Sequence, residues 1–152
     1  MAGIRPVIES GPLSFSANVN INGGQLVEPD ASNPGFIKPA TAATTKCLGV
    51  AVGDASGLPA PSKSSVDAWG NPVYNAFQPP NEVAVAYEGV WKLTAQGAIA
   101  FGDWVIVGTV AGTVASGGAT PNPLQVVGRC VDPLGIADTV RGKIRLGGLG
   151  GA

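Results

Sequence analysis

Carboxylates and thiols are the candidate chemical groups of this chain, because its sequence contains no histidine. Histidine is the commonest general base and the commonest transition-metal ligand. Glu82 and Glu88 fall on one face of an expected strand, but six residues separate them, which is roughly 20 Å of extended chain. A glycosidase pair needs about 5–9.5 Å. The two glutamates therefore predict no acid–base catalysis.

The remaining motifs also lack the partners that catalysis needs. The segment 147–152, GGLGGA, has neither the lysine nor the Ser/Thr of a phosphate-binding loop. Asp132 and Asp138 flank a loop that could bind calcium weakly, and a pair of solvated turn aspartates is the reading we favour. We expect no enzymatic activity, no catalytic residue, no metal and no cofactor.

Cys47 and Cys130 lie far apart in the sequence and outside any metal-ligand spacing. We expect two reduced, buried thiols, with a disulfide as the alternative. The N-terminus MAGIRPVIES has no apolar run typical of a signal peptide. No apolar stretch approaches the ~20 residues of a membrane span. The expected compartment is the cytoplasm in which the protein is made, and we expect no membrane partner.

The composition favours one domain that is partly covered by other protein. The 152 residues fit a single domain. Charged residues make up 12% of the chain, against the ~25% typical of soluble domains. Such a surface is either covered by partners or built from Ser, Thr, Asn and Gly. The net charge of −1 predicts no long-range attraction of nucleic acid.

Glycine and proline, 23 and 13 residues respectively, are spread along the chain and leave little room for helices. At most, 40–46 and 62–69 could form a helical turn. Alternating apolar residues predict an all-β sandwich or barrel, whose strands fall at 13–21, 25–29, 47–53, 82–95, 103–110, 124–132 and 139–147. The strand over 82–95 has Val83, Val85 and Tyr87 on one face, and Gly89 predicts a bulge or bend in it.

A weak internal repeat divides these strands into two sets. Residues 23–27 match 101–105 at an offset of 78, and 48–52 match 127–131 at an offset of 79. Residues 82–89 match 139–146 at an offset of 57. Two such sets could close on each other and bury both faces. Chance similarity between Gly- and Val-rich segments is the alternative.

Two further segments are candidates for contacts. The insert 54–81 contains Trp69, Tyr74 and Phe77, which either fold over their own core or dock on another subunit. The last expected strand places Arg141, Lys143 and Arg145 on alternate positions. This basic stripe could pair with Glu82 and Glu88 if their strand is adjacent, or with an acidic partner surface, or it could be a solvated face.

The order of the motifs resembles a known family. LGVAVGD and EVAVAYEGVWKLTA, followed by AIAFGDWVIVGTVAGTV, then VVGRCVD and TVRGKIRLG, are similar to the small capsid decoration (cement, or head-stabilising) proteins of tailed bacteriophages. The matching segments are Gly49–Ala51, Val83–Val90, Gly102–Val105 and Val127–Leu146, within 13–147. Each motif is short, so their order carries the resemblance.

The resemblance implies a compact, antiparallel, β-tulip-like domain that stabilises a phage head and has no enzymatic activity. Its implied partners are the major capsid protein and further copies of itself, as a homotrimer or a dimer. The implied location is the outer capsid surface of the virion, after assembly in the host bacterial cytoplasm. The sequence departs from the family pattern in an N-terminal arm (1–12), the insert 54–81 within the β domain 13–147, and a Gly-rich tail (148–152).

We expect the arm, the insert and the basic stripe to make the contacts. An extended arm can add to a neighbour's sheet edge, and buried aromatic residues can anchor it. The expected interface residues are Ile4, Arg5, Val7, Ile8, Trp69, Tyr74, Phe77, Arg141, Lys143 and Arg145. The alternative function is a carbohydrate-binding or adhesion module of a phage particle, with Trp69, Tyr74 and Trp91 as an aromatic row.

Overall fold

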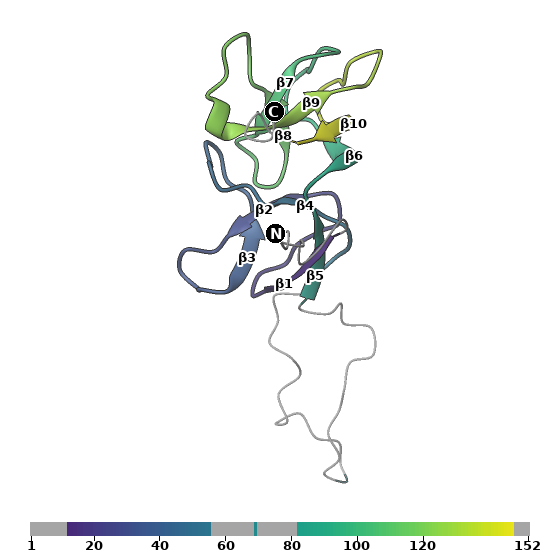
Figure 1. The fold of residues 1–152 in the computed structure, drawn as a ribbon. Helices are drawn as coiled ribbons and strands as arrows, with labels where there is room; N and C mark the ends of the chain where they lie inside the picture. The colour runs from purple at the N-terminus through teal and green to yellow at the C-terminus, as the bar shows by residue number, and fades with distance from the viewer. Residues whose placement is uncertain (1–11, 56–68, 70–81, 148–152) are drawn as a thin grey trace, which may run out of the picture.

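The structure is a computed structural model, and it describes residues 12–55, 69 and 82–147. These residues form two units of five strands each, one above the other in Figure 1. The first unit contains β1 (Leu13–Ala17), β2 (Leu26–Pro29), β3 (Phe36–Pro39), β4 (Gly49–Ala51) and β5 (Glu82–Ala86). The second contains β6 (Gly89–Thr94), β7 (Trp104–Val107), β8 (Val114–Ser116), β9 (Val126–Cys130) and β10 (Arg141–Leu146). The all-β prediction is confirmed.

The first unit is a closed barrel with the strand order β1-β3-β2-β4-β5. Its neighbours pair antiparallel, except that β1 and β3 run parallel, with Ala17 beside Ile37. The second unit has the order β6-β10-β9-β7-β8, and all four neighbouring pairs are antiparallel. A parallel bridge between Ala95 and Val114 brings its two outer strands together.

The two units therefore share one topology, strand for strand. The parallel bridge Ala95–Val114 takes the place of the parallel pair Ala17–Ile37. The register of the strand pairs gives these equivalent positions: Leu26 with Trp104, Val50 with Arg129, Ala86 with Arg145, and Gly35 with Gly112. The sequence repeat is thus a structural repeat, but its third offset is 59 and not 57.

Each set of strands closes on itself, and not on the other set. The expected continuous strand over 82–95 is wrong, because β5 belongs to the first unit and β6 to the second. The chain turns between them at Gly89, whose φ of +99° suits glycine. Ala86 is buried and Tyr87 is exposed, so the alternation ends where the strand ends.

Two apolar clusters fill the molecule. One lies inside the first barrel and contains Ile21, Val27 and Val85. The other fills the second unit and extends into the first, where Leu26 and Val50 belong to it. The units therefore share apolar packing across their junction.

The short strands β3 and β8 were missed by the sequence prediction, and they occupy equivalent places in the two units. Proline at both Pro34 and Pro39 obscured the first of them. The possible helical turn at 40–46 is not helical, whereas a short 3₁₀ helix, η1, forms at Pro123–Gln125. The other possible turn, at 62–69, lies outside the described residues except for Trp69.

Candidate functional site: a basic sheet face

Five cations share the outer face of the second unit's sheet. Side chains alternate between the two faces of a strand, so β10 places Arg141, Lys143 and Arg145 together. Lys143 lies opposite Lys92 on β6, and Arg145 lies opposite Arg129 on β9. We call these five residues the basic face. The three residues of the expected stripe are exposed on β10. Lys92 and Arg129, from the two neighbouring strands, extend the stripe across the sheet.

No carboxylate of the described residues forms an ion pair with the basic face. Over residues 12–55, 69 and 82–147, the structure contains one ion pair, between Lys38 and Glu28 at 3.6 Å. Glu82 lies on β5, in the first unit, whereas the neighbours of β10 are β6 and β9. Glu82 therefore does not lie on a strand adjacent to the stripe. Like charges placed directly opposite on a sheet repel. An acidic partner surface would relieve this repulsion.

Arg129 is the most constrained of these cations. Its guanidinium lies 3.7 Å from the centre of the Trp104 ring, which is a cation–π contact. Its Nε is buried and has no hydrogen-bond partner within the part of the chain that the structure describes. A buried N–H without an acceptor costs about 1–3 kcal/mol. Neither Trp104 nor Arg129 was singled out from the sequence, because only the register of β7 with β9 places them opposite each other.

The equivalent face of the first unit has the opposite character. Leu26, Val50 and Ala86 form a row across β2, β4 and β5 and are almost fully buried. The second unit packs against this row. On the second unit the equivalent row consists of Trp104, Arg129 and Arg145. Trp104, at one end, is half-buried, and Arg145, at the other end, is exposed.

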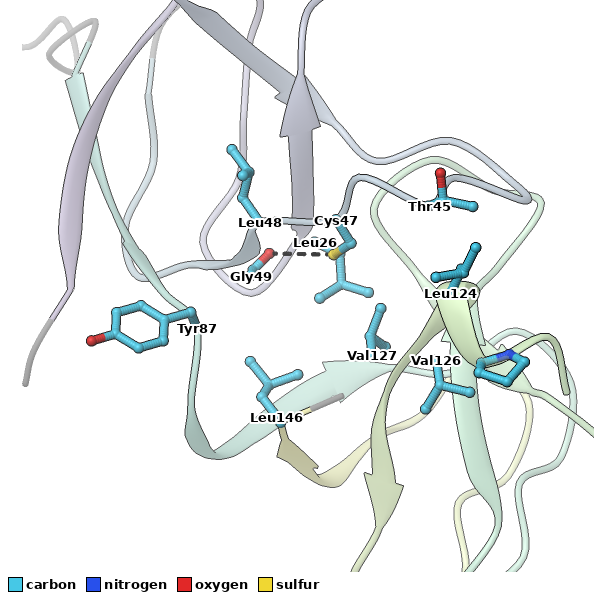
Figure 2. Close-up of a pocket in the computed structure, with 12 residues that line it drawn as sticks. Leu26, Thr45, Cys47, Leu48, Gly49, Tyr87, Leu124, Val126, Val127 and Leu146 are labelled. Atoms are coloured by element: carbon cyan, nitrogen blue, oxygen red, sulfur yellow. Dashed lines mark hydrogen bonds between the residues drawn. The ribbon is translucent and has the colours of Figure 1, made fainter. Parts of the chain in front are cut away.

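A cleft of about 330 Å³ opens between the two units (Figure 2). Leu48 and Tyr87 line it from the first unit, and Val127 and Leu146 line it from the second. Cys47 also lines it and is half-buried, with its thiol directed at the carbonyl of Gly49. Burial raises the pKa of the Cys47 thiol to about 11. Both cysteines are free thiols, and Cys130 is buried.

Several carboxylates of the described residues accept hydrogen bonds in their local structure. Asp138 accepts from the Gly97 backbone N–H at 2.7 Å, and Asp132 lies near the Lys143 N–H at 3.4 Å. Hydrogen bonds within its own turn lower the pKa of Asp30, chiefly the bond from Asn33. No group of three or more His, Cys, Asp or Glu in the described ranges could hold a metal ion.

Most of the other expected interface residues lie outside the described residues. These are Ile4, Arg5, Val7, Ile8, Tyr74 and Phe77. Trp69 is described and is 86% exposed. Of the possible aromatic row, Tyr74 lies outside the described residues, whereas Trp91 packs against the core and lies opposite Ile144. Its indole Nε1 donates to the Glu88 carbonyl at 2.9 Å. No helix among the described residues is long and apolar enough to cross a membrane.

Comparisons with known proteins find likeness in structure. No protein-family model and no curated protein sequence matches the chain. Among solved structures, the chain is similar to the N base of the head fiber gp8.5 of bacteriophage phi29, with a TM-score of 0.55 and 18% identity. The match covers 90% of this chain and 92% of that chain. At this level of identity the match establishes a shared fold.

Proposed function

We propose that this protein is a structural component of a phage virion, which binds the outer surface of the capsid and stabilises it. The observation that carries the proposal is the fold shared with the base of a phage head fiber over nearly the full length of both chains. The order of motifs that resembles capsid decoration proteins points to the same class. The proposed partner is the major capsid protein, the location is the virion, and no catalytic step is involved.

The basic face supplies the chemistry for such binding. Three residues of the basic face are exposed and do not belong to the row of Trp104, Arg129 and Arg145. These residues are Lys92, Arg141 and Lys143. These exposed cations pair with no carboxylate of the described residues. Exposed cations attract an acidic surface and raise the association rate, and salt weakens the attraction. We therefore assign these three residues to the capsid contact.

The N-terminal arm and the insert extend this contact. The arm enters the fold at Pro12, next to β1, and Pro12 lines a small pocket together with Tyr87 and Trp91. An apolar arm with Ile4, Val7 and Ile8 suits strand addition to a neighbour's sheet edge. Trp69, in the insert, exposes 86% of its surface and suits a role as an interface anchor.

Co-sedimentation with capsids tests the proposal. Capsids of the parent phage that lack this protein are mixed with increasing amounts of the full chain and sedimented at low and at high salt. We expect saturable binding that weakens as salt is raised. The absence of saturable binding at low salt, or binding of the same strength to an unrelated acidic protein particle, would contradict the proposal.

A further inference from the structure

One contact joins the two units through a single glycine. Gly112, in the β7–β8 loop of the second unit, accepts a hydrogen bond from Leu26 N at 2.9 Å and donates one to Ala40 O at 2.8 Å. It thus bridges the end of the β2–β3 ladder, where Ala40 N donates to Leu26 O. Gly112 is buried in this contact, and a Cβ on it would lie 2.8 Å from the Gln25 Cβ.

The β7–β8 strand pair of the second unit ends in the same way, but no described residue occupies the place that Gly112 takes at the end of the β2–β3 pair. Gly117 N donates to Trp104 O at 2.7 Å, as Ala40 N does to Leu26 O. Trp104 and Arg129 are a non-hydrogen-bonded pair, because Cys130 N donates to Asp103 O, so the Trp104 N–H points away from β9. Within the described residues, no backbone carbonyl accepts from Trp104 N and no backbone N–H donates to Gly117 O.

The first unit contains the matching loop, and no other described residue contacts its Gly35 position. Gly35 is the equivalent of Gly112, and their φ angles are +88° and +78°. Residues 31–35 are all exposed, and nothing lies within 4 Å of the position of a Cβ on Gly35. The Gly35 loop therefore has a backbone φ like that of Gly112, which binds the end of the β2–β3 strand pair. The open space around Gly35 leaves room for it to approach the end of another strand pair.

The charges of the two units are also complementary. The described residues of the first unit and the linker, 12–55 and 82–88, contain five carboxylates and two lysines, for a net charge of −3. The carboxylates are Glu28, Asp30, Asp54, Glu82 and Glu88. The second unit, 89–147, contains five cations and three aspartates, for a net charge of +2. Opposite net charges favour contact between the first unit of one copy and the second unit of another.

We propose that copies of this chain associate head to tail, with the Gly35 loop of one copy bridging Trp104 N and Gly117 O of the next. The docking row of the second unit, Trp104, Arg129 and Arg145, is then covered as its equivalent row is covered within the chain. A contact of this heterologous kind makes a closed ring if its rotation closes, and a fibre if it does not. The capsid-binding cations Lys92, Arg141 and Lys143 lie beyond the covered row.

The first test is the oligomeric state of the full chain in the absence of capsids, so it does not depend on the proposed function. We expect light scattering after size exclusion to show assemblies larger than one chain for the wild type. Gly35→Val should raise the apparent dissociation constant by at least about tenfold. In the proposed contact the new side chain would meet Asp103 of the next copy, which is the equivalent of Gln25, just as a side chain on Gly112 would meet Gln25 within the chain.

The matched control is Gly97→Val, since Gly97 has a φ of +80° and open space around its Cβ position but lies outside the contact. It should assemble as the wild type does, which separates loss of contact from backbone strain. A monomeric wild type, or a Gly35→Val variant that assembles normally, would overturn the proposal.

Hydrogen exchange provides a second, residue-level test. The Trp104 amide should exchange rapidly in monomeric protein at high dilution and slowly in the assembly. The Leu26 amide should be protected in both states, because Gly112 accepts from it within the chain. An assembly in which the Trp104 amide remains unprotected would show that copies meet through another surface, and the proposal would be wrong.

Discussion

Gly49 and Gly128 occupy equivalent positions in the two units, and each lies against the backbone of the same neighbouring strand position. A Cβ on Gly49 would lie 2.2 Å from the carbonyl oxygen of Ala86, and a Cβ on Gly128 would lie 2.2 Å from that of Arg145. Both contacts are with backbone, which cannot rotate away as a side chain can. The repeat thus preserves a close approach of strands as well as an order of strands.

Gly128→Ala should destabilise the protein, because the added methyl overlaps the Arg145 carbonyl and must push β9 from β10. Overpacking of this kind costs about 1–3 kcal/mol of unfolding free energy. Urea denaturation measures the change. Gly53→Ala is the control, since nothing lies within 4 Å of its Cβ position, and it should change the unfolding free energy by less than about 1 kcal/mol. Equal effects of the two substitutions would contradict the close approach.

The Cys47 thiol should be protonated and slow to react in the native protein at neutral pH, because burial raises its pKa to about 11. Thiol titration should give a slow phase in native protein and two thiols per chain after unfolding without reductant. The pKa is raised above the reference value of 9.0, so its contribution to stability is complete below about pH 9 and is lost as the pH rises toward 11.

Comparison with Cys47→Ala isolates that pH dependence. The difference in unfolding free energy between wild type and variant should be constant from pH 6 to about pH 9 and should shrink above it. A difference that grows with pH in this range would show that the thiolate, and not the thiol, is favoured by the fold.

Lys143→Glu should weaken capsid binding and reduce its salt dependence, since it places a carboxylate in the middle of the basic face. Removing a steering charge acts mainly on the association rate. The position is exposed, so the unfolding free energy should change by no more than about 0.5 kcal/mol. Lys46→Glu makes the same charge change at an exposed position of the first unit and should bind capsids nearly as well as the wild type. Equal losses in both variants would argue for a general charge effect.

Removal of residues 1–11 should leave the protein folded, because β1 begins at Leu13 and pairs with β3 and β5 without the arm. We expect an unchanged circular dichroism spectrum but reduced capsid occupancy. An arm-deleted protein that decorates capsids as tightly as the parent would assign binding to the sheet faces.

Trp69→Ala tests the insert in the same assay. A side chain that is 86% exposed stabilises the fold little, so the thermal transition should change by the equivalent of about 0.5 kcal/mol or less. Capsid occupancy should fall further in the double variant with Phe77→Ala. Loss of folding in either variant would indicate that the insert packs on its own core.

The sequence by itself determined the all-β class, the basic stripe and two of the three repeat offsets. These features depend on side-chain alternation and on residue type, which are local properties of a strand. Thus Arg141, Lys143 and Arg145 were placed on one face without knowledge of any neighbour.

Tertiary structure decided which strands pair and which faces are covered. Val83 and Leu93 fall in one apolar stretch of sequence, yet they lie in different units, because the chain turns at Gly89 from the barrel into the second sheet. The burial of Leu26 and the half-exposure of its equivalent Trp104 depend on what packs against each row, which no local pattern records. Strand pairing joins residues far apart in the chain, so Lys92 and Arg129 joined the basic face only through the register of β6 and β9 with β10.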